Sequence, residues 1–364
     1  MRTNGHCHGG HVHSAVTPGL PVSAHSVLDV VPQLPGQSAA AALRETVEVA
    51  QAADDLGYRR FWMGEQHGVR GVGSAAPAVL AAILAARTDR IRLGAGGVLL
   101  TNHPPLVVAE QFAALSAAYP SRIDLGVGQQ HRVVPSTAAA LGAGDRDTFP
   151  RRLDELCGFL RDGLPGRMPV GDVRLSLAGL PPPVFVLADH PGAAATAAVR
   201  GLPVVLAHHS AAAMTSAAVA TYREHFEPTG PAVTPYITVT VGVVAADSEE
   251  EAIIRFVEYV RMQTRLGTTG PRASTAELMA LLDAPLTGQE RGRAERLLDD
   301  PGHIVGSRAT VASELDALAA STTADEIMLV PLAFDGLVRS ATLRTVAAGL
   351  TRTIRTVQPL IATS

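Results

Sequence analysis

The sequence predicts a (β/α)8 barrel, the TIM barrel fold, with an insertion after its seventh strand. Three observations predict this fold. Short apolar runs alternate with helical stretches along most of the 364 residues. Eight strands can be expected from this alternation, and an open doubly wound sheet of such length seldom keeps the alternation to the end. Polar and glycine-rich loops follow the strands, which is where barrels of this class present their chemistry.

The composition is typical of a globular protein with a large core, with 47% hydrophobic and 18% charged residues. A formal net charge of −4 gives no reason to expect nucleic acid or an anionic membrane as partner, so a small-molecule substrate is expected. The two cysteines, Cys7 and Cys157, do not suggest a disulfide framework, and we expect a cytoplasmic protein. Neither a signal peptide nor a membrane span of ~20 apolar residues is recognisable.

The first half of the chain repeats a strand–helix unit. Residues 1–20 are rich in glycine and histidine without hydrophobic periodicity, which predicts a flexible tail before a single barrel domain over residues 21–364. The first helix begins after Ser38, a favourable N-cap, and ends near Gly57, where a left-handed C-cap belongs. The strands expected in this half are residues 22–31, 59–63, 91–95 and 123–127, with further helices over 74–86 and 104–118.

The second half continues the pattern with one interruption. Ser248 and Glu251 predict a capping box at the start of a helix. Residues 267–306 then break the rhythm with Gly, Pro and Thr clusters around a short helix near 275–283, so we interpret them as an excursion from the barrel. The strands expected in this half are residues 184–187, 203–207, 234–244 and 326–330, with helices over 151–160, 192–199 and 211–226 and a closing helix that carries Leu343, Val346, Leu350 and Ile354.

The loop after the second strand holds the first candidate site. Glu65, Gln66 and His67 follow this strand directly and precede the glycine-rich residues 68–73. Catalytic groups of a barrel cluster on the loops that follow its strands, so the position favours a functional role. The alternative is a Glu–His pair that only fixes the loop.

Glycines at the ends of strands three and four form a second candidate site. Several glycines would weaken an ordinary strand because they remove side chains that pack. Either a flat ligand lies close to this backbone, or a crowded barrel interior requires small residues. A cation just beyond strand four could also bind a phosphate. The residues concerned are Ala95, Gly96 and Gly97 after strand three, and Gly126, Gly128, Gln129 and Arg132 in and after strand four.

The turn after strand five is a third candidate, because it leads into the N-terminus of a helix. Asp189, His190, Gly192 and Ala193 lie in this turn. Free N–H groups and the helix dipole could stabilise an anion there without a basic side chain. The alternative is a plain turn in which Asp189 caps the helix.

A metal site is not predicted. Together, His190, His208, His209 and Asp335 resemble the ligand layout of barrel metal hydrolases. Those enzymes also carry a His-x-His pair at the end of strand one, and in this chain such pairs occur only in the tail, before any strand. Adventitious metal binding by the tail is conceivable.

Several segments together resemble the bacterial luciferase-like family of flavin-dependent monooxygenases, particularly its alkanal-monooxygenase-like branch. They span residues 22–355 in the family's order and with its spacing. The matching segments are SVLD (26–29), LGYRRFWMGEQH (56–67), SAAP (74–77), RIRLGAGGVLL (90–100), NH (102–103), VVAEQF (107–112), RIDLGVG (122–128), GLP (201–203) and ADEIM (324–328).

The resemblance implies a barrel with an insertion after strand seven, reduced FMN as co-substrate, molecular oxygen as oxidant and a homodimer. In this family the flavin ring lies against the backbone at the end of strand three, which is similar to Ala95, Gly96 and Gly97 here, often through a non-proline cis peptide. The flavin phosphate lies near the loops after strands four and five. By the resemblance, the residues at that position are Gln129, Arg132, Asp189, His190, Gly192 and Ala193.

The chain also departs from the family pattern. Where the family reads Glu-His-His after strand two, this chain reads Glu65-Gln66-His67, and Gln66 cannot transfer a proton near neutral pH. His67 could replace the missing histidine. Near the phosphate, the family's arginine is Gln129, and its serine and threonine align with His190 and Ala193, for which Arg132, Arg151, Arg152 or His190 could compensate.

From the resemblance we expect reduced FMN to react with oxygen to a C4a-hydroperoxide that oxygenates a small organic substrate. His67 would be the acid–base group, Glu65 would orient the loop, and a separate flavin reductase would supply reduced FMN. The site must exclude water, and residues 64–73 and 267–306 are the candidates for its cover. The alternatives are an oxidoreductase that uses the deazaflavin F420 for hydride transfer and a flavin-binding protein without catalysis.

Overall fold

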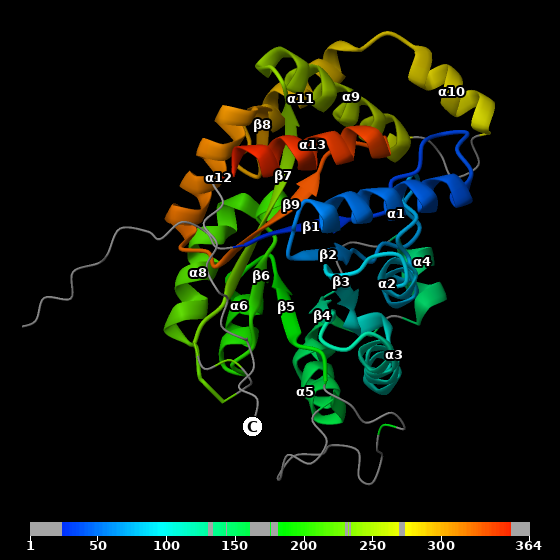
Figure 1. Cartoon of the computed structure of the whole chain (residues 1–364). Coiled ribbons are helices and arrows are strands. Elements are labelled where there is room, and N and C mark those ends of the chain that lie inside the picture. The colour runs from blue at the N-terminus through cyan, green and yellow to red at the C-terminus, as the bar shows by residue number, and fades with distance from the viewer. Residues whose placement is uncertain are drawn as a thin grey trace, which may run out of the picture.

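The computed structural model shows a closed barrel of parallel strands surrounded by helices (Figure 1). It describes residues 24–129, 134–142, 144–160, 175, 181–229, 232, 234–268 and 274–350. The strands lie in the order β6, β5, β4, β3, β2, β1, β9, β7, and β6 also pairs with β7, which closes the sheet. The predicted TIM barrel is therefore confirmed.

The barrel strands coincide with the expected apolar runs, with one extension. β3 was expected to end at residue 95 but continues to Leu99, because its pairing with β4 shifts register between Ala95 and Val98 and then resumes. The glycines thus lie inside the strand rather than at its end. The barrel strands are β1 (His25–Asp29), β2 (Arg60–Met63), β3 (Arg92–Leu99), β4 (Ile123–Gly128), β5 (Val184–Ala188), β6 (Val204–Leu206), β7 (Ile237–Ala246) and β9 (Glu326–Pro331).

Helices cover the outside of the barrel and begin where the sequence offers caps. The Ser38 hydroxyl accepts a hydrogen bond from Ala41 N–H at 3.2 Å, which stabilises the start of α1. The helix expected over 211–226 is α8, which is preceded by a 3₁₀ turn over Ala212–Met214, and α7 ends where the helix was expected to begin. The helices are α1 (Ala39–Asp55), α2 (Pro77–Ala85), α3 (Pro105–Ala118), α4 (Pro135–Leu141), α5 (Phe149–Leu160), α6 (Pro191–Ala198), α7 (His208–Ala211), α8 (Thr215–Glu224), α12 (Arg308–Thr322) and α13 (Gly336–Gly349).

The segment between β7 and β9 adds three helices and a ninth strand at the top of the view in Figure 1. The Ser248 hydroxyl caps the first helix by accepting from Glu251 N–H at 3.2 Å, but the Glu251 carboxylate pairs with Arg255 instead of completing the expected capping box. β8 pairs with the end of β7 outside the barrel. The elements of this segment are α9 (Glu249–Thr268), α10 (Thr275–Asp283), α11 (Gly288–Leu298) and β8 (His303–Ser307). Within the described ranges, no helix is both long and apolar enough to cross a membrane.

The amino ends of the strands are closed by buried charges. The Arg60 guanidinium donates to Asp124 Oδ2 at 2.7 Å and to both Glu326 oxygens at 3.0 Å. The three side chains are almost completely shielded from water. Trp62 lies above them, edge-on to Phe185 with ring centroids 5.0 Å apart. Because this end of the barrel is filled, a ligand can reach the strands only from their carboxyl ends.

Candidate active site

Glu65 links two neighbouring strand ends at the open rim of the barrel. It lies two residues after β2, and its side chain is buried. Its Oε2 atom accepts a hydrogen bond from the N–H of Leu99, the last residue of β3, at 2.9 Å. Because the carboxylate is held by a neighbouring strand, its position is fixed without a ligand.

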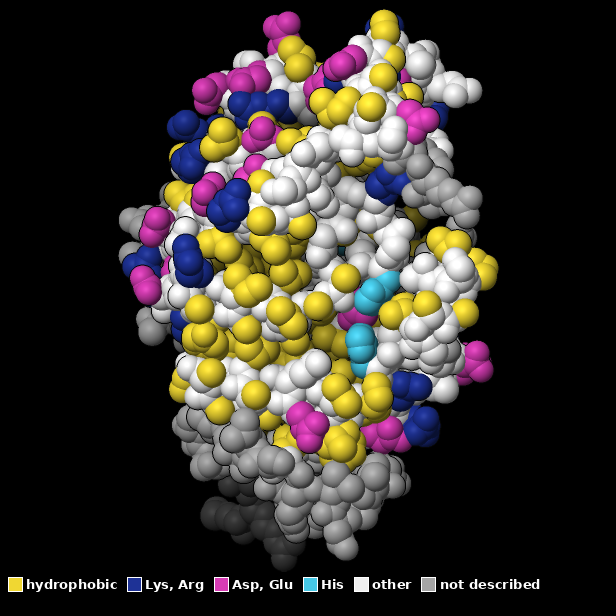
Figure 2. Space-filling model, turned by 90° about the vertical axis from the view of Figure 1, so that its right-hand side faces the viewer, with side chains coloured by type: hydrophobic (Ala, Val, Ile, Leu, Met, Phe, Trp, Pro, Cys, Tyr) yellow, Lys and Arg dark blue, Asp and Glu magenta, His cyan; other side chains and the backbone are white. Residues whose placement is uncertain are grey.

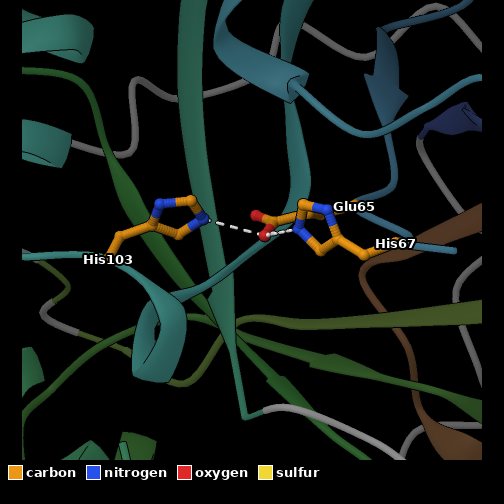
Figure 3. A group of neighbouring side chains, drawn as sticks. All are labelled: Glu65, His67 and His103. Carbon is orange, nitrogen blue, oxygen red and sulfur yellow. Dashed lines mark hydrogen bonds and ion pairs between the residues drawn. The ribbon is translucent and has the colours of Figure 1, made fainter. Parts of the chain in front are cut away.

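Two histidines converge on the other carboxylate oxygen (Figure 3). The Nε2 atom of His67 lies 2.7 Å from Glu65 Oε1, and that of His103 lies 2.8 Å from the same atom. The His67 side chain is 15% exposed and the His103 side chain 33% exposed. The buried carboxylate therefore supports two imidazoles that solvent or a ligand can reach.

The hydrogen bonds keep this carboxylate charged. Burial by itself would raise the pKa of Glu65, but hydrogen bonds from His103, His67 and Leu99 N–H lower the pKa below its ordinary value. An ionised carboxylate only accepts hydrogen bonds, so each imidazole presents Nε2–H to it. A neutral ring in this orientation keeps Nδ1 as its acceptor. The cluster is thus arranged for proton transfer at Nδ1.

His103 was not among the residues singled out in the sequence. It follows a short 3₁₀ turn, Leu100–Asn102, after β3, so it lies at the same rim as Glu65 although 38 positions separate the two residues. The signal was present in the Asn-His pair at residues 102–103, but the expected strand ended at residue 95. With β3 ending at Leu99, His103 would have qualified as a loop residue of the rim.

Gln66 lies beside the cluster and outside it. Its backbone N–H donates to Ser74 O at 2.8 Å, and its side chain is exposed. The Ser74 hydroxyl donates in turn to Gly64 O. These bonds close the base of the loop over residues 64–74 and place Gln66 toward a cavity rather than toward Glu65.

The glycines of β3 permit close packing. The Gly96–Gly97 peptide is cis. A Cβ atom on Gly96 would lie 2.7 Å from Leu28 Cδ1, and one on Gly97 would lie 2.8 Å from Gly126 O. Both residues are buried. The crowded interior of the barrel therefore explains why these positions are glycines. Contact between the backbone of Ala95, Gly96 and Gly97 and a flat ring stays a prediction.

The turn after β3 contains polar atoms without partners. The amide nitrogen and oxygen of Asn102 and the hydroxyl of Thr101 are buried, and none has a hydrogen-bond partner in the described part of the chain. Unpaired buried polar atoms are unfavourable, so they indicate a ligand or water that offers both donors and acceptors. Asn102 is next to His103. A heterocycle with an N–H between carbonyl groups, such as the flavin ring system, fits this set of atoms.

The turn after β5 differs from the expectation in one respect. His190, not Asp189, caps α6, and its Nδ1 atom accepts a hydrogen bond from Ala193 N–H at 3.2 Å. The Ala193 N–H is therefore not free to bind an anion, because it already donates to the imidazole of His190. Gly192 lies in the same first turn. The residue just after β4, Gln129, is at the neighbouring strand end, since β4 and β5 pair directly. Arg132 lies outside the described residues.

The histidines after β6 have structural partners. His208 is buried, with Nδ1 2.8 Å from the Thr215 hydroxyl and Nε2 2.8 Å from Pro301 O. His209 Nδ1 lies 2.6 Å from the Thr240 hydroxyl. Asp335 caps α13 by accepting from Leu337 N–H at 2.7 Å. In the part of the chain that the structure describes, these residues do not form a metal-binding group.

Glu65, His67 and His103 do lie close enough to hold a metal ion, with one ligand atom from each within 4.8 Å of the others. Both Nε2 atoms face a single oxygen at hydrogen-bonding distance, which is the geometry of two N–H donors. A metal would require both nitrogens to lose their protons and to turn their lone pairs toward the ion. The absence of a metal stays a prediction.

A TIM barrel with a carboxylate–imidazole cluster at the carboxyl ends of its strands has the architecture of a barrel enzyme. The chain belongs to the luciferase-like monooxygenase family, whose model matches residues 25–326. A luciferase-like monooxygenase of Escherichia coli K12 is 36% identical over 319 residues, covering 86% of this chain and 92% of that protein. The N-acetyl-S-alkylcysteine monooxygenase of Bacillus subtilis is 38% identical over 48% of this chain and 53% of its own length.

Solved structures share the same architecture. The crystal structure of apo-MsnO8 has a TM-score of 0.75 at 32% identity, covering 90% of this chain and 98% of that one. At lower identity the likeness concerns the fold alone. It includes the oxygenating constituent of 3,6-diketocamphane monooxygenase from Pseudomonas putida in complex with FMN, at 19% identity and TM-score 0.64. It also includes the F420-dependent tetrahydromethanopterin reductase of Methanopyrus kandleri, at 16% identity and TM-score 0.63.

Proposed function

We propose that this protein is a flavin-dependent monooxygenase that uses reduced FMN and molecular oxygen to oxygenate a small organic substrate. The observation that carries the proposal is the Glu65 carboxylate, which fixes the imidazoles of His67 and His103 at the open end of the barrel. The membership of a monooxygenase family supports it, as do a relative named as an N-acetyl-S-alkylcysteine monooxygenase and a structural neighbour in complex with FMN.

The residues that would hold the flavin surround this cluster. The Asn102 amide offers a donor and an acceptor to the polar edge of the ring. The backbone of residues 95–97 would contact its plane, and Gly192 in the first turn of α6 would face the phosphate together with Gln129 and Arg132. Reduced flavin, when bound, supplies the two electrons with which one oxygen atom enters the substrate while the other leaves as water.

His67 and His103 would hold and transfer protons in this reaction. Each ring donates Nε2–H to Glu65 and presents Nδ1 at the rim. Glu65 orients the rings and stabilises a positive charge on either of them without itself becoming protonated. Besides His67, His103 is a second candidate for the function lost at Gln66.

Cofactor binding and oxygen uptake test this proposal. We expect reduced FMN to bind and to support substrate-dependent oxygen uptake, and His67→Ala and His103→Ala each to lower the rate at least tenfold without loss of FMN affinity. Turnover with F420 alone and no oxygen uptake would favour a hydride-transferring oxidoreductase, whose fold is the same. Flavin binding without turnover for any substrate would favour a non-catalytic protein.

We also propose a homodimer and a separate flavin reductase as partners. α2 and α3 carry solvent-exposed apolar side chains, namely Val79 at 60%, Ile83 at 40% and Val107 at 42%. Figure 2 shows hydrophobic side chains gathered on the side of the molecule where Figure 1 shows these helices. A second copy of the chain would cover this face. Light scattering would show a monomer if the face has another use.

A further inference from the structure

A cavity of about 240 Å³ lies beside the Glu65 cluster. Its walls come from the loops after β1, β2 and β9 and from the second half of α9. One of its lining residues is Gln66, which stands between Glu65 and His67 in the chain. The cavity and the candidate catalytic cluster therefore share one loop, and an occupant of the cavity would have one end next to the cluster.

The walls are tied together before any ligand binds. Pro32 and Val72 form an antiparallel bridge, and Gln33 N–H donates to Gly71 O at 2.9 Å. Gly71 has a φ of +76°, and a Cβ there would stand 2.6 Å from Leu266 Cδ1, so the loop after β2 packs directly on α9. A preformed cavity loses little entropy on binding, which is what a specific ligand site requires.

The lining is mainly apolar. Aliphatic and aromatic side chains from three of the loops and from α9 face the cavity, and the rings of Tyr259 and Phe334 lie 5.9 Å apart. Such a lining favours the apolar part of a ligand. Arg70 also lines the cavity and is the one charged residue among its lining residues. The apolar residues include Val30, Val69, Val72, Leu266, Leu332 and Phe334.

The Tyr259 hydroxyl adds a directed polar group. It accepts a hydrogen bond from Gln263 Nε2 at 3.1 Å, and Gln263 Oε1 accepts in turn from Arg293 at 3.1 Å. With its acceptor position used, the hydroxyl offers its proton to a ligand. Burial raises the pKa of Tyr259 to about 12, so the group stays a donor over the physiological range.

We propose that this cavity is the substrate subsite, and that it takes the apolar body of a substrate whose acceptor oxygen receives a hydrogen bond from Tyr259. That the occupant is a substrate rests on the monooxygenase function proposed above. Binding of a ligand in the cavity does not require flavin. The part of the molecule to be oxygenated lies at the Gln66 end, next to His67.

Calorimetric titration of the protein with 2-decanone, with and without oxidised FMN, tests the subsite. We expect saturable binding of 2-decanone and at least tenfold weaker binding of 2-butanone, which has the same acceptor oxygen but lacks most of the apolar chain. Ala333→Leu, which fills the cavity from the loop after β9, should weaken 2-decanone binding at least tenfold and leave FMN affinity unchanged. Ala309→Leu, an exposed position on α12, is the matched control and should change neither affinity.

Tyr259→Phe gives a second test that does not alter the size of the cavity. It should weaken 2-decanone binding about three- to tenfold, the loss expected for one hydrogen bond. Absence of 2-decanone binding in both titrations would overturn the subsite, as would equal binding by wild type and Ala333→Leu. If FMN fails to bind while 2-decanone still does, the monooxygenase proposal fails and the subsite remains.

Discussion

The two ends of the barrel use similar groups for different purposes. At the amino ends of the strands, Arg60 lies between Asp124 and Glu326, and all three are buried. At the carboxyl ends, Glu65 lies between His67 and His103, and the imidazoles are partly exposed. The first cluster joins β2, β4 and β9, and the second joins the loops after the neighbouring strands β2 and β3.

The difference lies in the nitrogen partner. A guanidinium stays charged at every pH that the protein meets, and buried Coulombic attraction raises the pKa of Arg60 further. An imidazole changes its charge near neutrality. The closed end can therefore only hold the strands together, whereas the open end can exchange protons with a ligand.

The largest effect on stability is expected at the closed end. Arg60→Met leaves Glu326 and Asp124 in the barrel interior without their shared cation, and breaking such a buried pair costs about 3–5 kcal/mol of unfolding free energy. Urea denaturation measures this loss. Arg90→Met, whose side chain is 71% exposed in its pair with Asp54, is the matched control and should cost less than about 1 kcal/mol. Equal losses of unfolding free energy in the two variants would contradict the structural role of Arg60.

At the open end the same kind of change should affect activity more than stability. Glu65→Gln keeps the shape of the side chain but removes the charge that orients both imidazoles, so we expect turnover to fall about a hundredfold or more. The free energy of unfolding should fall by only about 1–3 kcal/mol. Steady-state oxygen uptake and urea denaturation on the same preparation separate the two effects. Unchanged turnover would remove Glu65 from the mechanism.

A smaller effect is expected in the pH dependence of stability. The pKa of Glu65 is lowered in the folded protein, so its charge stabilises the fold above the ordinary glutamate pKa of about 4.3, and this contribution is lost as the pH falls through the lowered value. The stability difference between wild type and Glu65→Gln should shrink once the pH falls below about 4.3. A difference that grows in acid would have the wrong sign.

Metal removal should have the smallest effect. If the Nε2 atoms of His67 and His103 are N–H donors to Glu65, prolonged dialysis against a chelator should leave turnover and melting temperature unchanged. Elemental analysis of protein without its first 20 residues should then show less than one zinc per ten chains. Stoichiometric metal, together with loss of activity on chelation, would show that Glu65, His67 and His103 form a metal centre.

The sequence predicted the barrel because the alternation of apolar runs and helices is a local property of the chain. Glu65 and His67 could also be predicted, since they directly follow a strand and loops after strands meet at one rim. His103 could not, because its approach to Glu65 depends on how far β3 continues beyond its glycines, which pairing with β4 decides. The role of His190 as a helix cap is likewise a matter of side-chain rotation that no pattern shows.

The close approach of β3 and β4 has an evolutionary consequence. A Cβ atom on Gly94 would stand 2.4 Å from Asp124 O, and one on Gly126 would stand 2.3 Å from Ala95 O. The obstacle in both cases is main chain, which cannot rotate away as a side chain can. We therefore expect glycine to be retained at both positions as the sequence evolves. Changes in the chemistry of the protein would then arise in the loops at the carboxyl ends of the strands and not at these two strand positions.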